Sequence, residues 1–172
     1  LQGEIFVKVL GKQAATLAVC SRAFHSTTLA PFLESACALT GMDRALVMNS
    51  GAEAVETAIK LVRKWGYQKK GVPEGKAEIV VCGNNFHGRT ISIVSFSSDE
   101  SARGGFGPFT PGFRAAPFGD AEAVAELIDD HTVAVLVEPI QGEGGVRVLP
   151  EAWVEAACRL TAQHDVLLVA DE

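Results

Sequence analysis

The feature of this sequence that most constrains its fold is a series of short apolar runs separated by longer stretches with helical patterning. The clearest runs are residues 77–82 (AEIVVC), 133–137 (VAVLV) and 166–170 (VLLVA). Runs of this length and polarity are typical of strands that are buried on both faces. Because helical patterns alternate with them, we predict an α/β domain with a mainly parallel sheet flanked by helices.

The other elements are predicted from caps, turns and apolar periodicity. We expect helices over 4–15, 29–39, 90–95, 121–128 and 150–163, extended pieces at 17–20, 45–48, 113–117 and 146–149, and a Gly/Phe/Pro loop over 101–111. Another helix begins at Ser50, whose spacing to Glu53 is that of a capping box, and ends at Gly71. Its expected apolar face is Ala54, Ala58, Leu61, Val62 and Trp65, with an ion pair between Glu56 and Lys60.

Composition and charge narrow the classes of function. The chain has 172 residues, enough for one domain with a substantial core, and its net charge of -6 gives no reason to expect nucleic acid or an anionic membrane as partner. No stretch approaches the roughly 20 apolar residues of a membrane span. The first residues include neither an initiator Met nor a signal-peptide pattern, so we expect an internal start and a cytoplasmic protein. The 4 cysteines are scattered without metal-ligand spacing, which predicts buried free thiols and no metal site.

In an open α/β sheet, ligands bind at the carboxyl ends of the strands. The stretch MNSGAEA follows the expected strand at 45–48 and opens a helix. The free N–H groups and the dipole of a helix N-terminus favour an anion there, Gly51 allows close approach of the backbone, and Ser50 offers a hydroxyl. A plain capping box without a ligand is the alternative interpretation.

The stretch GNNFHGRT follows the strand at 77–82 and offers three different chemical groups. Phe86 has a flat face for stacking, His87 a titratable ring, and Arg89 a fixed cation suited to a carboxylate. Each could instead have a structural role only, with Phe86 in the core, His87 at the surface and Arg89 as a structural cation. Their occurrence together at a strand end favours a site.

Acidic residues follow two of the clearest apolar runs, 133–137 and 166–170. Glu138 and Glu143 lie in VEPIQGEGG, where an orienting or substrate-side role is favoured over an acid/base pair. Asp171 comes directly after VLLVA, and a carboxylate there suits a cationic partner such as a protonated pyridine nitrogen. A solvated acid at a strand end is the alternative.

Taken together and in this order, the stretches resemble one enzyme family. NSGAEAVETAIKLVRKWGY, NFHGRT, VEPIQGEGG and LLVADE are similar to segments of the class III pyridoxal-phosphate aminotransferases of fold type I. Within it, SRAF (21–24), RKWGY (63–67) and GFGPFTPGF (105–113) look most like the ornithine-specific members. The resemblance covers essentially the whole chain and implies the central part of the large, cofactor-binding domain.

The resemblance also implies a role for each matching residue. The implied pyridoxal 5'-phosphate site is Ser50, Gly51, Ala52, Phe86, His87, Glu138 and Asp171. The first three would hold the phosphate, Phe86 would stack on the ring, and Asp171 would be the catalytic residue that keeps the ring nitrogen protonated. Arg89 would bind the substrate carboxylate and Glu143 would lie on the substrate side. The implied reaction moves the δ-amino group of ornithine to 2-oxoglutarate, giving glutamate semialdehyde and glutamate, in a homodimer.

The chain departs from the family in one chemically decisive respect. The family's Schiff-base lysine lies well beyond the DE motif, and none of Lys8, Lys12, Lys60, Lys64, Lys69, Lys70 and Lys76 matches it. The family's N-terminal arm and C-terminal small domain have no counterpart either. We therefore expect this chain alone to be inactive, and the complete gene product to be an aminotransferase.

Three alternatives stay open on the sequence. Acetylornithine, 4-aminobutyrate or another ω-amino acid could replace ornithine as donor. The chain could also be a non-catalytic α/β domain that binds a phosphorylated ligand at Gly51, or a purely structural module. The reading frame beyond Glu172 separates these, because only the enzyme requires a further lysine.

Overall fold

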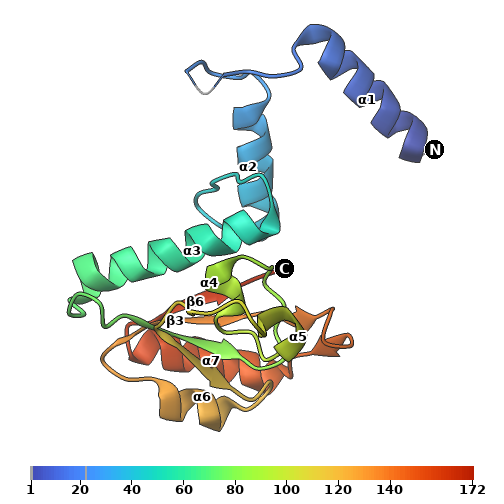
Figure 1. The fold of residues 1–172 in the computed structure, drawn as a ribbon. Coiled ribbons are helices and arrows are strands. Elements are labelled where there is room, and N and C mark those ends of the chain that lie inside the picture. Colours follow the sequence, from blue (N-terminus) through green and yellow to red (C-terminus); the bar gives the residue numbers. More distant parts are fainter. Residues whose placement is uncertain (1, 22) are drawn as a thin grey trace. The chain divides into compact units, whose positions relative to one another are not determined.

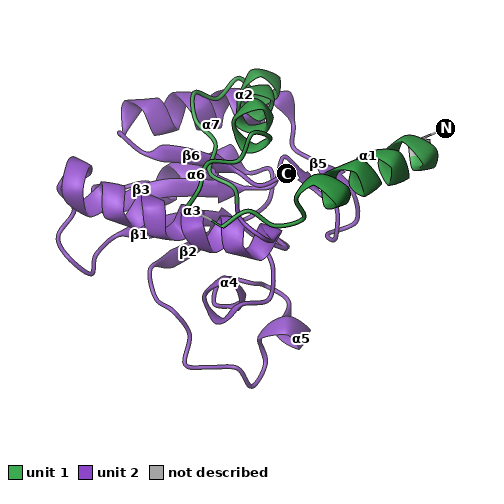
Figure 2. Cartoon of the chain, turned by 90° about the horizontal axis from the view of Figure 1, so that it is seen from above, with its two compact units in different colours: residues 1–47 green, residues 48–172 purple. Residues whose placement is uncertain are grey.

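The chain forms two compact units, residues up to 47 and residues from 48 onward (Figure 2). The computed structural model describes residues 2–21 and 23–172. The first unit holds the helices α1 (Gln2–Thr16) and α2 (Leu29–Thr40), as the sequence predicts. Gly41 ends α2 in the left-handed conformation, at φ 70°, and its N–H donates to the carbonyl of Cys37. Residues 17–20 form no strand, and the similarity at 21–24 includes Arg22, which lies outside the described residues.

The second unit is built on a four-stranded parallel sheet (Figure 1). Its strands are β1 (Glu78–Cys82), β2 (Phe113–Ala116), β3 (Thr132–Val137) and β6 (Leu167–Ala170), in the order β2-β1-β3-β6. Every neighbouring pair is parallel, and every residue of β3 is buried. The predicted parallel sheet is therefore confirmed. A small antiparallel pair, β4 (Ile140–Gln141) and β5 (Arg147–Val148), follows β3.

Helices cover both faces of this sheet. One face carries α3 (Gly51–Trp65), which continues into the π-helical turn η1 (Gly66–Lys70) and ends at Gly71 as predicted. The other face carries α6 (Ala121–Leu127) and α7 (Glu151–Gln163). Two short helices, α4 (Ile91–Val94) and α5 (Glu100–Arg103), lie between β1 and β2. The predicted loop at 101–111 is thus wrong at its start, where Asp99 caps α5 through a bond from the Ser101 N–H.

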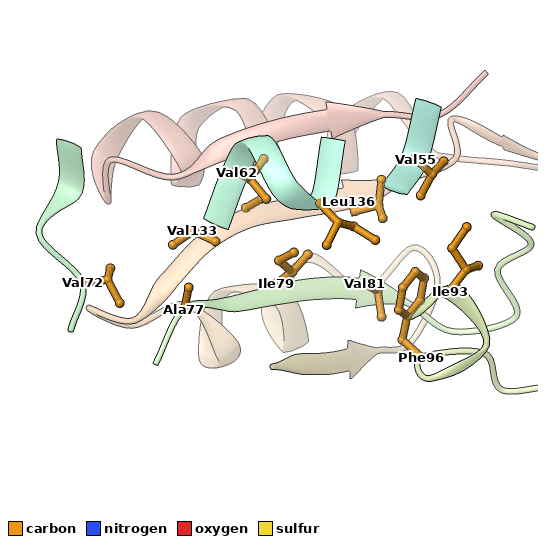
Figure 3. Close-up of a cluster of buried hydrophobic side chains, with 12 residues drawn as sticks. Val55, Val62, Val72, Ala77, Ile79, Val81, Ile93, Phe96, Val133 and Leu136 are labelled. Carbon is orange, nitrogen blue, oxygen red and sulfur yellow. The ribbon is translucent and has the colours of Figure 1, made fainter. Parts of the chain in front are cut away.

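A buried apolar cluster lies between α3 and the sheet (Figure 3). From α3 it takes Val55, Ile59 and Val62, and these pack among strand residues such as Ile79 and Leu136. Burying each such side chain contributes roughly 1.5–3 kcal/mol. The predicted face of this helix is therefore wrong except at Val62 and the partly buried Trp65, and Leu61 is 57% exposed.

Three smaller expectations about strands, ion pairs and cysteine burial also differ from the structure. Residues 45–48 form no strand, and no strand of the described chain pairs with them, so Leu46 stays 72% exposed. Glu56 accepts a hydrogen bond from the Thr90 hydroxyl, and no ion pair joins it to Lys60 among the described residues. All cysteines are free, but only Cys82 is buried. No helix in the described part of the chain has the length and apolar content for crossing a membrane.

Candidate functional site

Three neighbouring strands deliver the candidate residues to one edge of the sheet. Phe86 and His87 follow β1, Glu138 follows β3, and Asp171 follows β6. The strands β1, β3 and β6 are adjacent and parallel, so their carboxyl ends meet at the same edge. Glu138 therefore comes from the central strand, between the two flanking groups.

Glu138 ties the loop after β1 to the end of β3. One oxygen of its carboxylate, Oε2, accepts a hydrogen bond of 3.0 Å from the backbone N–H of Phe86. Burial raises the pKa of Glu138 above its ordinary value, although the Phe86 N–H and nearby His87 work in the opposite direction. The negative charge of Asp171 adds to the rise in this pKa.

Two further side chains hold the same loop. The amide nitrogen of Asn85 donates to the carbonyl of Cys82 at 2.6 Å, at the end of β1. The amide nitrogen of Gln141, from β4, donates to the carbonyl of Gly83 at 2.9 Å. The loop that presents Phe86 and His87 is thus held by hydrogen bonds to the end of β1 and to β4.

The imidazole of His87 contacts the carboxylate of Asp171. Its Nδ1 lies 2.7 Å from Oδ2 of Asp171, and the His87 side chain is fully buried. The backbone of Asp171 is fixed as well, because its N–H donates to the carbonyl of Val137 at 2.9 Å and continues the pairing of β6 with β3. The Asp171 side chain keeps 28% of its surface exposed.

The N-terminus of α3 lies near His87 and Asp171 and lines the same hollow. Ser50 caps the helix, and its Oγ accepts a bond of 3.3 Å from the N–H of Glu53. The carboxylate of Glu53 accepts from the N–H of Asn49 at 2.8 Å, rather than from Ser50 as a capping box would require. Gly51 and Ala52 occupy the first turn, where backbone N–H groups have no acceptor within the helix.

A hollow of about 280 Å³ collects most of the predicted cofactor residues. Its lining is Gly51, Ala52, Phe86, His87, Gly88, Glu138, Ile140, Asp171 and Glu172. Ser50 is not part of the lining. The predicted site residues did not include Gly88, Ile140 or Glu172. Gly88 could have been found from its place in NFHGRT, because a glycine in a loop after a strand is a signal for a backbone conformation that other residues avoid, and its φ is indeed +124°.

A second hollow, of about 650 Å³, shares Phe86, His87 and Gly88 with the first and holds both predicted substrate residues, Arg89 and Glu143. The guanidinium of Arg89 lies 5.5 Å from the centre of the Phe86 ring. Asp99 also lines it, a residue that the sequence did not indicate, and hydrogen bonds from Ser101 lower its pKa.

The arrangement suits a flat, phosphorylated ligand with a cationic ring nitrogen. The first turn of α3 favours a phosphate, the ring of Phe86 offers an aromatic face, and the carboxylate of Asp171 matches a cation. These residues fit pyridoxal phosphate. No group of three or more metal-binding side chains occurs among the described residues.

Comparisons with known proteins agree on one family. The sequence model of the family Aminotransferase class-III matches residues 4–172. The ornithine aminotransferase of Bordetella pertussis is 52% identical over 99% of this chain, which spans 42% of that relative. A solved ornithine aminotransferase from Toxoplasma gondii, described as partially occupied by PLP at its active site, matches with a TM-score of 0.92 at 41% identity, over 95% of this chain and 39% of its own.

Neighbouring specificities occur among the matches as well. The acetylornithine aminotransferase of Elizabethkingia anophelis has a TM-score of 0.77 and 48% identity, covering 96% of this chain and 40% of its own. These similarities confirm the predicted α/β architecture of fold type I. The roles of the individual site residues stay predictions.

Proposed function

Because this chain belongs to the class III aminotransferase family, we propose that the complete gene product is a pyridoxal-phosphate-dependent ornithine aminotransferase. It would move the δ-amino group of ornithine to 2-oxoglutarate and release glutamate semialdehyde and glutamate. One observation carries the proposal: Asp171, the ring of Phe86 and the first turn of α3 line one hollow. The identity of 52% to an ornithine aminotransferase supports the choice of donor.

Each residue of the hollow has a task that its position allows. The N–H groups of Gly51 and Ala52 would bind the phosphate, with Ser50 holding the helix start in place. Phe86 would cover one face of the ring, and Asp171 would hold a proton on the ring nitrogen. The cofactor, when bound, supplies an electron sink that stabilises the carbanion left by proton loss from the substrate. Glu138 would keep Phe86 in place through its backbone N–H.

The second hollow would receive the substrate. Arg89 would bind a carboxylate of the amino acid or oxo acid, because a guanidinium pairs with carboxylates in two parallel hydrogen bonds. Glu143 lines the same hollow and would repel a second carboxylate while attracting an amino group. Both hollows share the wall formed by Phe86, His87 and Gly88, which would bring substrate and cofactor together.

Acetylornithine is the second candidate donor. The structure from Elizabethkingia anophelis, an acetylornithine aminotransferase, is 48% identical to this chain, whereas the one from Toxoplasma gondii is 41% identical. The two donors differ by an acetyl group on the α-nitrogen, so the substrate-side residues would decide between them.

We also propose that the chain is the central part of the large domain and that the lysine of the active site comes from outside these residues. None of the lysines in the described chain lines either hollow.

We propose further that the complete protein is a cytoplasmic homodimer. Sedimentation of the complete gene product would test the dimer, and a monomer with full activity would contradict it.

The decisive experiment compares donors on the complete gene product. We expect formation of glutamate semialdehyde from ornithine and 2-oxoglutarate, with kcat/KM at least about tenfold above that for N-acetylornithine. Asp171→Ala should lower kcat about 100-fold or more, because it removes the charge that stabilises the ring cation. Asp130→Ala, at an exposed position, is the matched control. An enzyme that prefers N-acetylornithine would transfer the assignment to the second candidate, and full activity of Asp171→Ala would remove Asp171 from the chemistry.

A further inference from the structure

We propose that Gln141 is a positioning residue that holds Glu143 at a fixed spacing from Arg89, so that the site recognises the free α-amino group of its donor. The inference rests on the proposed function, in which Arg89 binds a carboxylate and Glu143 attracts an amino group. Both residues line the larger hollow, but they come from different segments. Arg89 follows β1, whereas Glu143 lies in the turn between β4 and β5. Contacts between these two segments therefore set the spacing of the opposite charges.

The turn that carries Glu143 is a closed hairpin. Its two strands, β4 and β5, pair antiparallel. The backbone N–H groups of Gly145 and Val146 both donate to the carbonyl of Gly142, at 3.2 and 3.3 Å. A turn closed by these bonds keeps its shape, so the contacts at its base also place Glu143.

Gln141 joins the base of this hairpin to the segment after β1. The residue is fully buried, and its Nε2 donates to the carbonyl of Gly83 at 2.9 Å. Gly83 directly follows β1 and begins the loop that leads to Arg89. Because the carbonyl of Gly83 only accepts hydrogen bonds, the amide of Gln141 is oriented with Nε2 toward it and Oε1 away from it.

Stability alone does not account for a glutamine at this position. Oε1 of Gln141 is buried and has no hydrogen-bond partner among the described residues. A buried acceptor without a donor costs free energy, and an apolar side chain of similar length would avoid that cost. An amide that is only half satisfied, yet joins two segments of the site, is better suited to placing those segments than to stabilising the core.

Gly144 forms a second contact between the hairpin and the loop after β1. A Cβ added at Gly144 would lie 3.1 Å from the carbonyl oxygen of Asn84 and 3.2 Å from Oε1 of Gln141. A side chain at this position would therefore move the hairpin and the loop apart by a few tenths of an ångström. Gly144 also lines the larger hollow beside Glu143, so this movement would change the spacing of the charges.

Two donors report on that spacing. The α-carbon of ornithine carries a carboxylate and an ammonium group, and simultaneous hydrogen bonds to both require Arg89 and Glu143 at matching positions. 5-Aminopentanoate has the same chain and carboxylate but no α-amino group. The ratio of kcat/KM for the two donors therefore measures the placement of Glu143. The amount of bound cofactor does not alter this ratio, because it affects both donors alike.

Two variants loosen the contact in different ways. Gln141→Met keeps the length of the side chain without the amide, and Gly144→Ala adds a Cβ. Each should lower the preference for ornithine over 5-aminopentanoate by about tenfold, the effect of weakening a hydrogen bond between charged groups. Gln141→Met should leave the midpoint of urea unfolding nearly unchanged, because it also removes the unsatisfied Oε1. Gly142→Ala is the matched control, because a Cβ added there meets no described atom within 4 Å.

Two further measurements on the complete gene product separate placement from a general loss of structure. Glu143→Gln should lower the donor ratio itself, and adding Gln141→Met to it should change the ratio no further, because the charge that Gln141 places is gone. Hydrogen exchange of the protein without cofactor should become faster over residues 142–147 in Gln141→Met and Gly144→Ala, and not in Gly142→Ala.

The outcomes distinguish the two proposals. A wild-type protein that does not transaminate ornithine, or that prefers N-acetylornithine, would overturn the proposed function itself. If the wild type uses ornithine without preferring it to 5-aminopentanoate, or if Gln141→Met lowers the ratio equally with and without the charge of Glu143, the positioning role is wrong. Should Gln141→Met fail to fold, Gly144→Ala decides: a donor ratio and a hydrogen exchange equal to those of Gly142→Ala would overturn the inference.

Discussion

The carboxylate of Glu138 accepts the backbone N–H of Phe86 at 3.0 Å and so joins the ends of two neighbouring strands. The carboxylate side chain is buried, at 7% exposure for the residue. The bond holds the segment from which Phe86 and His87 reach the smaller hollow. Glu138 is therefore placed to act on the shape of the site through the backbone.

Glu138→Ala should lower the free energy of unfolding by about 1–3 kcal/mol, because it leaves the Phe86 N–H without its acceptor. Glu138→Gln keeps a carbonyl oxygen and should lose less than half as much. Urea unfolding of the complete gene product without cofactor measures both. Equal losses in the two variants would mean that the negative charge, not the acceptor, holds the loop.

The raised pKa of Glu138 predicts a specific pH dependence. Because burial raises this pKa above 4.5 in the folded state, the folded protein binds the proton more tightly than the unfolded chain. The stabilising contribution of the protonated group is fully present below the unfolded pKa and is lost as the pH rises through the folded pKa. The stability of the wild type relative to Glu138→Gln should therefore fall as the pH rises above 4.5.

Unfolding both proteins in urea at several pH values measures this difference. Subtracting the unfolding free energy of the variant cancels the contribution of carboxylates that titrate alike in both proteins. Asp129 is one of these, and its pKa is lowered. Burial raises the pKa of Asp129, but hydrogen bonds, including those from the His131 N–H and Arg114, outweigh that effect. A difference that grows with pH would contradict the raised pKa.

Much of the sheet could be predicted from the sequence because strands that are buried on both faces appear as short apolar runs. Residues 132–137 are buried without exception, as the apolar run at 133–137 predicts for a strand that is covered on both faces. The rule that ligands bind at the carboxyl ends of parallel strands selected the candidate residues, and Glu138 and Asp171 do follow adjacent strands. The pairing of His87 with Asp171 was beyond the sequence, because strand order decides it and local patterns do not encode strand order.

The face of α3 shows why helix patterns can mislead. Ala54, Ala58 and Leu61 have helical spacing, but so do Val55, Ile59 and Val62, which the structure buries. Gly66 continues the buried row and allows close approach, since an added Cβ would lie 2.2 Å from Cγ1 of Val133. The position of the sheet selects between two apolar rows that the sequence leaves equivalent.

Gly88→Ala should disturb both stability and cofactor binding. The φ of +124° strains any residue with a Cβ, and the added atom would also lie 3.0 Å from the Cβ of Ala52 and 3.1 Å from Cδ1 of Ile93. We expect a loss of about 1–3 kcal/mol from the backbone conformation alone, with the contact adding to it. Urea unfolding and cofactor titration measure the two effects.

Gly75→Ala is the matched control, because Gly75 has a φ of +76° but nothing within 4 Å of an added Cβ. It should lose stability through conformation only and leave cofactor affinity unchanged. If both variants bind the cofactor as the wild type does, the close approach of Gly88 to α3 has no part in forming the site.

Arg89→Ala should raise the KM for the oxo acid by about 10- to 100-fold, the effect of losing hydrogen bonds between charged groups. The dissociation constant of pyridoxal phosphate should change little, because Arg89 lines the larger hollow and not the smaller one. Arg89→Lys should recover only part of the loss, since lysine lacks the planar pair of donors.

Arg103→Ala provides the matched control for Arg89. Its guanidinium lies 4.5 Å from the centre of the Phe109 ring, a contact similar to that of Arg89 with Phe86, yet Arg103 lines neither hollow. Steady-state kinetics on the three variants should therefore separate substrate binding from loss of a stacked cation. Unchanged KM values in Arg89→Ala would exclude Arg89 from the substrate site.

The isolated 172-residue chain should bind pyridoxal phosphate without catalysing transamination. The residues proposed to hold the phosphate and the ring line one hollow, but neither hollow contains a lysine among the described residues. A lysine amine must reach the cofactor for covalent attachment and proton transfer in this chemistry. Borohydride reduction followed by mass spectrometry should mark one lysine of the complete gene product, outside these residues, and only scattered surface lysines of the isolated chain. Turnover by the isolated chain, or stoichiometric labelling of one of its own lysines, would contradict the assignment.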